Sequence, residues 1–105
     1  MLEHVIKRAV EELRARDEAR EEMRRRARRA RMLSKQAILL MHGAAMDDAK
    51  VKLGEAREII GEIAPGSMRQ SEQQVSYEAR AAEEEYAEAS ILYSLKTAAA
   101  FPQPE

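Results

Sequence analysis

Apolar and small residues recur at alternating steps of four and three through the first 42 positions of the chain. This spacing places them on one face of an α-helix, close to the seam of a heptad pattern. Gly43 stands where many helices end on a residue with positive φ. The pattern therefore predicts one helix over residues 2–42, about 60 Å long at about 1.5 Å per residue. Its seam positions are Leu2, Ile6, Ala9, Leu13, Arg16, Arg20, Met23, Ala27, Ala30, Ser34, Ala37 and Met41.

A second helix is predicted over residues 48–63, where an apolar seam again follows helical spacing. Asp47 is the expected N-cap, because a carboxylate at this position accepts unpaired amide groups of the first turn. Pro65-Gly66 is expected to end the helix, and residues 66–74 are expected to form a loop or a frayed helix start. The seam consists of Ala49, Leu53, Ala56, Ile60 and Ile63.

A third helix is predicted over residues 72–100, and Phe101-Pro102-Gln103-Pro104 is expected to stop it, since each proline lacks an amide donor. The short connection between the first two helices predicts an antiparallel hairpin. Because the second helix is much shorter than the first, it can cover only the stretch from about Arg25 to His42. The third helix is then expected to run parallel to the first along this same stretch.

This arrangement leaves the N-terminal half of the first helix without a cover inside the chain. An apolar stripe of this length exposed to water would favour aggregation. We therefore expect another subunit or further sequence to bury the stripe. If another subunit of the same chain buries it, the protein is a homo-oligomer. The uncovered residues are Leu2, Val5, Ile6, Val10 and Leu13.

Length and composition favour one all-α domain over residues 1–105. Good helix formers dominate, aromatic residues make up only 4% of the chain, and no stretch alternates apolar with polar residues. The absence of Cys excludes disulfides and thiolate metal sites. No apolar stretch approaches the about 20 residues of a membrane span, and no secretory signal opens the chain. We expect no membrane partner and a cytoplasmic location.

The net charge of −1 hides a basic cluster in the predicted first helix, formed by Arg24, Arg25, Arg26, Arg28, Arg29 and Arg31. Arg24, Arg28, Arg31 and Lys35 share one helical stripe. Arg25 and Arg26 have acids one turn before them, whereas Arg28, Arg29 and Arg31 have no acid within four residues. The partners of these last three are therefore an acid elsewhere, such as Glu72 or Glu78, another subunit, or nucleic-acid phosphate. A solvated helix face is the alternative interpretation.

Two carboxylates on the predicted third helix form the second candidate site. Glu85 and Glu88 continue the stripe of Ala81, Leu92, Leu95 and Ala99, which we expect to face inward. Carboxylates on such a face are unfavourable unless they are paired or bind a metal ion. Residues three apart on a helix bring both carboxylates within reach of one Mg²⁺. A competing apolar stripe on the same helix consists of Val75, Ala79, Ala82, Tyr86, Ala89 and Tyr93.

Two segments together resemble the translin and translin-associated factor X family. The first is Arg16-Asp17-Glu18-Ala19-Arg20-Glu21 followed by Ser34-Lys35-Gln36-Ala37-Ile38-Leu39-Leu40-Met41-His42. The second is Glu85-Tyr86-Ala87-Glu88-Ala89-Ser90, continuing through Leu95-Lys96-Thr97 to Phe101. The spacing between the segments also resembles that of the family, and the similarity extends from about residue 16 to residue 101.

The resemblance implies an α-helical subunit of closed, barrel-like homo-oligomers, commonly octamers, that hold single-stranded RNA or DNA inside. Catalytic members of the family are endoribonucleases that bind Mg²⁺. By this resemblance, Glu85 and Glu88 correspond to the metal-binding ExxE pair, and Lys35 to a lysine near the metal and the scissile phosphate. Arg24, Arg28, Arg29, Arg31 and Lys35 are the expected nucleic-acid contacts. The family's metal-binding Asp lies on a later helix, so residues 1–105 are expected to be the N-terminal part of a longer translin-like fold. We expect them to cleave RNA very slowly or not at all.

Three other functions remain open from the sequence. A non-catalytic RNA- or DNA-binding module would use the basic cluster and keep the two glutamates as structural acids. An all-α Mg²⁺-dependent nucleotide pyrophosphohydrolase would use an EExxE-like helix together with a second acidic motif, which this chain lacks. A structural helical assembly protein would need only the long first helix and its uncovered stripe.

Overall fold

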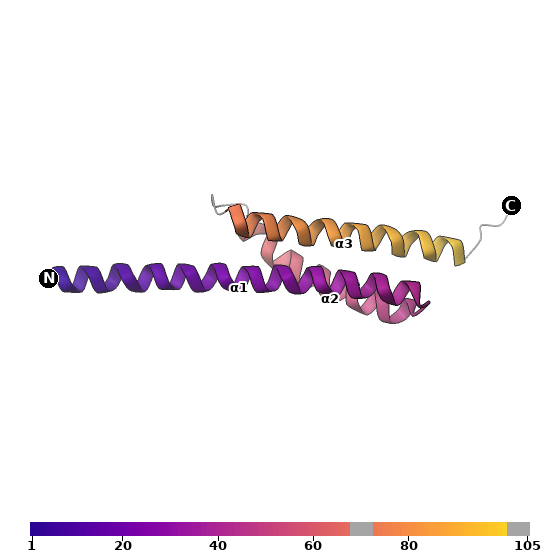
Figure 1. Cartoon of the computed structure of the whole chain (residues 1–105), viewed down its shortest axis with the longest axis horizontal. Helices are drawn as coiled ribbons and strands as arrows, with labels where there is room; N and C mark the ends of the chain where they lie inside the picture. The colour runs from indigo at the N-terminus through magenta and orange to yellow at the C-terminus, as the bar shows by residue number, and fades with distance from the viewer. Residues whose placement is uncertain (68–72, 101–105) are drawn as a thin grey trace.

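A computed structural model of the chain describes residues 1–67 and 73–100, with side chains described for residues 1–63 and 77–99. Within these ranges the chain forms three α-helices and no strand, which confirms the all-α prediction. The helices are α1 (Leu2–His42), α2 (Met46–Ser67) and α3 (Gln73–Ala100). Figure 1 shows that α2 and α3 both lie along the C-terminal half of α1. The molecule is elongated as a result, with dimensions of 78 × 21 × 16 Å.

The turn after α1 differs from the sequence prediction by one residue. Gly43 has an ordinary φ of −88°, and the positive φ falls at Ala44, with a value of 63°. The Ala45 N–H donates to the Leu40 carbonyl at 2.8 Å, and the Ala44 N–H donates to the Met41 carbonyl at 3.0 Å. These two bonds define a Schellman ending whose left-handed residue is Ala44. Glycine therefore lies one position before the place where it would relieve strain.

Helix α2 begins earlier and ends later than predicted. It starts at Met46, so Asp47 lies inside the first turn and the prediction that Asp47 is the N-cap is wrong. The Ala45 carbonyl accepts the Ala49 N–H at 3.0 Å, and Met46 packs against the core. The early start follows because the Schellman turn leads directly into helical backbone and burying Met46 stabilises it.

The predicted stop at Pro65-Gly66 is also wrong, since α2 runs on to Ser67. Proline removes one donor from the hydrogen-bond ladder, and the buried Ile63 holds this part of α2 against the other helices. The predicted loop at residues 66–74 is reduced accordingly, because Gln73 already belongs to α3. Residues 68–72, and the stop expected at 101–104, lie outside the described residues.

The core consists of two small clusters that follow each other along the bundle. Both are rich in alanine, which lets helices approach closely because interaxial distance depends on the side chains at the contact. Between them Ser34 is fully buried, and its hydroxyl donates to the Ala30 carbonyl at 2.9 Å, which satisfies it without a partner helix. The first cluster is Ala27, Ala30, Ile63, Ala79 and Ala82. The second is Ala37, Met41, Ala49, Leu53 and Ala89.

These clusters confirm the predicted seam of α2 and that of α1 from Ala27 onward, but correct the inward face of α3. The buried face of α3 carries Ala79, Ala82 and Ala89, with Tyr86 and Tyr93 packed beside them. The stripe through Glu85 and Glu88, predicted to face inward, lies at the edge of the bundle: Glu88 and Leu95 are exposed. Both α1 and α2 pack on the alanine face, and no described helix covers the other side.

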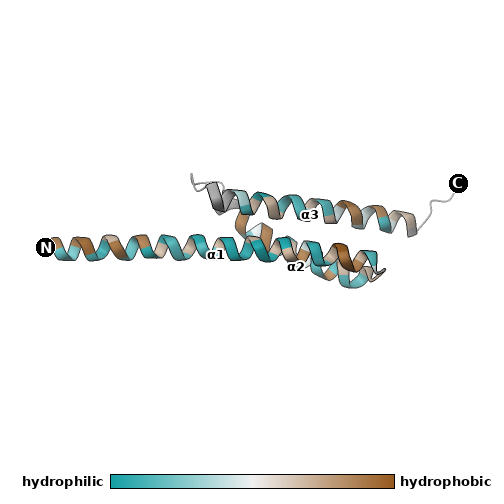
Figure 2. Ribbon diagram, in the orientation of Figure 1, coloured by the Kyte–Doolittle hydropathy of each residue, from teal (hydrophilic) through white to brown (hydrophobic). Residues whose placement is uncertain are grey.

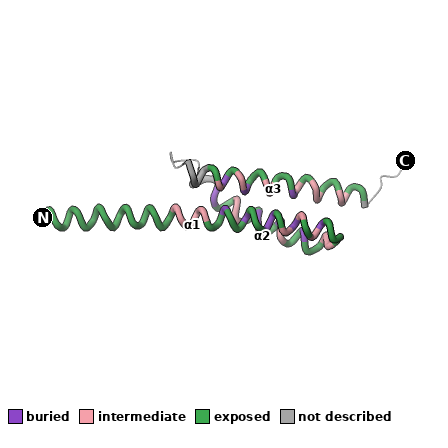
Figure 3. Tube along the Cα trace, in the orientation of Figure 1, coloured by how far each residue is buried: buried purple, intermediate pink, exposed green. Residues whose placement is uncertain are grey.

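The N-terminal part of α1 projects beyond the other two helices, as predicted. All of residues 1–19 are exposed, and burial begins only at Arg20 (Figure 3). Apolar turns recur along this projecting part (Figure 2), and its large apolar side chains are exposed to solvent. Among the described residues, no helix is long and apolar enough to cross a membrane.

Candidate nucleic-acid interface

A hollow of about 420 Å³ lies between α1 and α3 on the exposed side of the bundle. Helix α1 contributes Arg31 to its lining. Helix α3 contributes residues that recur at steps of three and four and therefore share one face. These are Tyr77, Arg80, Ala81, Glu84, Glu85 and Glu88. The hollow thus contains both predicted metal-binding glutamates and one arginine of the predicted basic stripe.

Lys35 lies next to this hollow, one helical turn after Arg31. Its Nζ is 3.7 Å from Oε1 of Glu85, and the Glu85 side chain is only 18% exposed. The structure therefore brings together Lys35 and Glu85, which are 50 positions apart in the sequence. A carboxylate this far withdrawn from water needs a cation nearby, and the lysine supplies one.

Glu85 and Glu88 differ in their surroundings although they lie one turn apart. Glu85 is partly covered and ion-paired, whereas Glu88 is exposed and has no ion pair within the described chain. The difference arises because Glu85 adjoins the α1 contact and Glu88 lies further around α3. Only one of the two carboxylates therefore experiences the desolvation that was predicted for both.

The donor set fits a divalent cation only in part. Two carboxylates from one helix supply two oxygen ligands to a hard cation such as Mg²⁺, and Glu84 lines the same hollow. Among the described residues, however, no group of three or more His, Asp or Glu side chains lies close enough to hold a metal ion. Arg31 and Arg80 line the hollow as well, and their charges oppose a bound cation.

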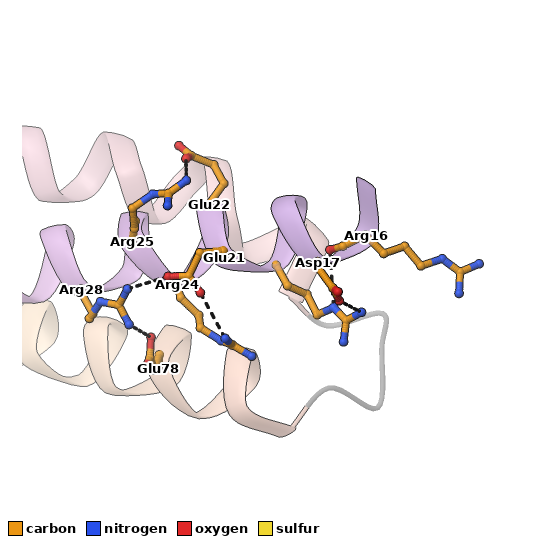
Figure 4. Close-up of polar contacts among 9 residues, drawn as sticks. Arg16, Asp17, Glu21, Glu22, Arg24, Arg25, Arg28 and Glu78 are labelled. Carbon is orange, nitrogen blue, oxygen red and sulfur yellow. Dashed lines mark hydrogen bonds and ion pairs between the residues drawn. The ribbon is translucent and has the colours of Figure 1, made fainter. Parts of the chain in front are cut away.

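Most of the basic cluster pairs with acids of the same chain (Figure 4). Arg24 contacts Glu21 at 3.2 Å, and Arg25 contacts Glu22 at 2.8 Å. Arg26 also contacts Glu22, at 3.1 Å, and reaches Glu62 of α2 at 2.8 Å. Hydrogen bonds from both Arg25 and Arg26 hold the pKa of Glu22 below its ordinary value. Reciprocally, the bond to Glu22 raises the pKa of Arg25.

Arg28 and Arg29, which lack an acid within four residues, find partners further away. Arg28 lies between Glu21, at 3.2 Å, and Glu78 of α3, at 3.5 Å (Figure 4). Arg29 lies 3.9 Å from Glu55 of α2. The sequence pointed to Glu78 as a possible partner but missed Glu21, because two helical turns separate it from Arg28. The other suggested acid, Glu72, lies outside the described residues.

Arg31 is the exception in the cluster. In the described part of the chain it forms no ion pair, and its side chain lines the hollow together with Arg80. Arg80 and Tyr77 were not singled out from the sequence. Their only sequence signal is that they share the helical face of Glu84 and Glu88, a signal that becomes readable once the outward face of α3 is known.

Comparisons of the chain with protein-family models, with curated proteins and with solved structures give no match.

Proposed function

We propose that this chain binds single-stranded nucleic acid, RNA in particular, as a translin-like helical subunit whose hollow between α1 and α3 receives the phosphate backbone. One observation carries the proposal. The two sequence segments that resemble translin meet at this hollow, where Lys35 of the first lies 3.7 Å from Glu85 of the second. Polar side chains that come from distant segments and converge at one hollow are typical of a binding site.

Arg31 is the principal phosphate contact in this proposal. Its guanidinium has no carboxylate partner in the described chain. A phosphate could therefore pair with the guanidinium without breaking an existing ion pair. Arg80 supplies a second guanidinium in the same hollow. Arg24, Arg28 and Arg29 already pair with glutamates and would have to exchange partners, so their contribution is smaller.

Tyr77 adds a surface on which a base can stack. Its side chain is 69% exposed and lines the hollow beside the two arginines. Stacking on an aromatic ring tolerates every base, and phosphate contacts carry no sequence information. The site is therefore suited to single strands with little sequence preference.

Glu85 and Glu88 are the groups that would hold Mg²⁺ in a translin-like endoribonuclease. A cation bound there would lower the pKa of a coordinated water and offset charge on phosphate. In the chain itself Lys35 balances the charge of Glu85, and two carboxylates leave most of an octahedral shell to water or to other ligands. We therefore propose weak cation binding, and RNA binding without rapid cleavage, for residues 1–105.

The arrangement of the helices supports the same proposal at the level of the subunit. The first core cluster joins residues 27 and 30 of α1 to residue 63, late in α2, and the second joins 37 and 41 to 49 and 53, early in α2. This order supports an antiparallel arrangement of α1 and α2. Residues 79 and 89 of α3 follow α1 in the same order. We propose that this bundle is the repeating unit of a translin-like homo-oligomer.

Nucleic-acid binding is tested with a fluorescein-labelled oligouridine over a series of salt concentrations. Replacing Arg31 and Arg80 by Ala should weaken binding and flatten the plot of log K against log salt by about 0.7 for each phosphate that the variant no longer neutralises. The matched control is Arg57→Ala, which removes an exposed arginine of α2 that does not line the hollow. Equal affinity and equal slope in the double variant and the control would refute the phosphate site.

Cation binding is tested separately with Mn²⁺ as a paramagnetic probe in amide NMR spectra. Substoichiometric Mn²⁺ should broaden signals around Glu85 and Glu88, and the E85Q/E88Q variant should lose this local broadening because it removes the charge with little change of shape. Glu83→Gln is the control, since Glu83 lies on the same helix but does not line the hollow. Broadening that persists in the double variant would rule these carboxylates out as cation ligands.

A further inference from the structure

The projecting N-terminal part of α1 carries apolar side chains that nothing in the described chain covers. Leu2, Val5, Ile6, Val10 and Leu13 are between 46% and 72% exposed. Together with Ala9 they are the apolar residues of segment 2–13, and their spacing puts them on one face of the helix. An exposed apolar stripe of this kind is typical of an association surface.

The order of these residues is self-complementary. Under the exchange of position i with position 15 − i, Leu2 exchanges with Leu13, Val5 with Val10, and Ile6 with Ala9, so every apolar residue of the segment falls on another. In a two-fold symmetric antiparallel pair, residue i of one subunit lies level with residue j of the other and the reverse, so this order sets apolar residues opposite apolar residues. The centre of such a pair lies between positions 7 and 8.

We propose that segment 2–13 pairs with the same segment of a second copy of this chain, in antiparallel orientation. The pair places Leu2 level with the partner's Leu13, Val5 level with the partner's Val10, and Ile6 level with the partner's Ala9. Such a pair buries the exposed stripe on both helices. The proposal is independent of the nucleic-acid site, which lies on the other half of α1.

The charges beyond the stripe select this orientation over a parallel one. The seam of α1 continues from Leu13 to Arg16 and Arg20. A parallel pair in register would stack each of these arginines against its own copy. It would also place Glu12 of one helix beside the partner's Asp17, because these two acids flank the seam in successive heptads and face each other in a parallel pair. In the antiparallel pair the partner helix ends before it reaches Arg16, so none of these like-charge contacts forms.

The position of the bundle leaves room for the pair. Residues 1–19 are exposed throughout, and α2 and α3 contact α1 only from Arg20 onward. Segment 2–13 spans about 18 Å at about 1.5 Å per residue. A partner helix of that length therefore fits on the projecting part, and the two bundles come to lie at opposite ends of the pair. Because the contact is short, we expect a weak dimer that depends on concentration.

Cysteine cross-linking in the full-length chain tests the orientation directly, since the chain has no cysteine of its own. Leu2→Cys protein mixed with Leu13→Cys protein should form a disulfide-linked dimer under mild oxidation. Either protein alone should not, because positions 2 and 2 of an antiparallel pair lie about 16 Å apart at about 1.5 Å per residue. Cross-linking of L2C alone at the rate of the mixture would establish a parallel pair and overturn the proposal.

The control mixture pairs L2C with Leu39→Cys, which places the second cysteine at an exposed leucine on the other half of α1. A cross-link here as fast as in the L2C and L13C mixture would mean that the stripe docks elsewhere, and would also overturn the proposal. Sedimentation supplies a second measurement. Leu13→Glu should raise the dimer dissociation constant at least tenfold while Leu39→Glu leaves it unchanged, with helix content verified by circular dichroism. A wild-type chain that stays monomeric at every accessible concentration refutes the pair.

Discussion

At the scale of single residues, the turn after α1 shows a residue type displaced by one position. Ala44 holds a left-handed φ of 63°, which an alanine Cβ disfavours by about 1 kcal/mol, while Gly43 occupies an ordinary conformation that any residue adopts. A Cβ added at Gly43 would meet only the carbonyl oxygens of Leu40 and Leu39, at 3.7 and 3.9 Å. The sequence places both residues within the turn, but it cannot show which one takes the positive φ.

Exchanging these two residues should therefore stabilise the protein. In G43A/A44G the glycine relieves the left-handed strain, and the variant still has one glycine and one alanine in the turn, so the entropy of the unfolded chain is unchanged. The free energy of unfolding should therefore rise by about 1–2 kcal/mol. Urea denaturation followed by circular dichroism measures the gain. Ala44→Gly alone should account for a large share of it. A destabilised double variant would contradict the assignment of the Schellman turn.

The ion pairs show which contacts helical spacing can predict and which it cannot. Helical spacing within one turn predicted acidic partners for Arg25 and Arg26, because such neighbours lie on the same helix face. Both arginines pair with Glu22, which is the residue four before Arg26 but three before Arg25. The pairs of Arg29 with Glu55 and of Lys35 with Glu85 depend on how the helices pack, so no local pattern could assign them. The sequence therefore predicted the residue types of the candidate site, but the prediction left out two of its members, Arg80 and Tyr77.

At the scale of the helices, α3 presents two apolar stripes, and the structure buries only one of them. The residues of both stripes have helical spacing, so the sequence alone did not distinguish them. What distinguishes them is charge together with close approach. The other stripe carries two glutamates, whereas Ala79, Ala82 and Ala89 let α3 approach α1 and α2 closely. The bounds of α1 were predictable because a long seam sets them, and those of α2 were not, because the turn chemistry and Met46 set its start.

The buried face of α3 leads to a prediction about volume. Ala82→Leu should destabilise the protein by about 1–3 kcal/mol, because the added carbons have no space in a core cluster where Ala82 is 1% exposed. Ala87→Leu is the control on the same helix, at an exposed position, and should change stability by less than about 0.5 kcal/mol. Thermal unfolding compares the two. Equal effects, or a larger effect at Ala87, would show that α3 packs on its other face.

At the scale of the whole molecule, the protein has two regions of unequal stability along one continuous helix. The bundle buries two core clusters against the C-terminal half of α1, whereas residues 1–19 bury nothing in the described chain. Helical hydrogen bonds in the projecting part lack the tertiary packing that gives protein helices most of their stability. The hollow lies on the stable region, which suits the proposed phosphate site.

Hydrogen exchange should detect this division and its dependence on concentration. In dilute protein, amides of residues 2–13 should exchange much faster than those of residues 30–41. The hydrogen bonds of residues 2–13 open by local fraying, whereas those of residues 30–41 open only when the bundle opens. Raising the protein concentration should slow exchange in residues 2–13 and leave residues 30–41 unchanged, since the antiparallel pair protects only the projecting segment. Leu13→Glu should remove the concentration dependence. Uniform protection along α1 in dilute wild-type protein would contradict the division, and protection of residues 30–41 that rises with concentration would place the contact between copies on the bundle instead.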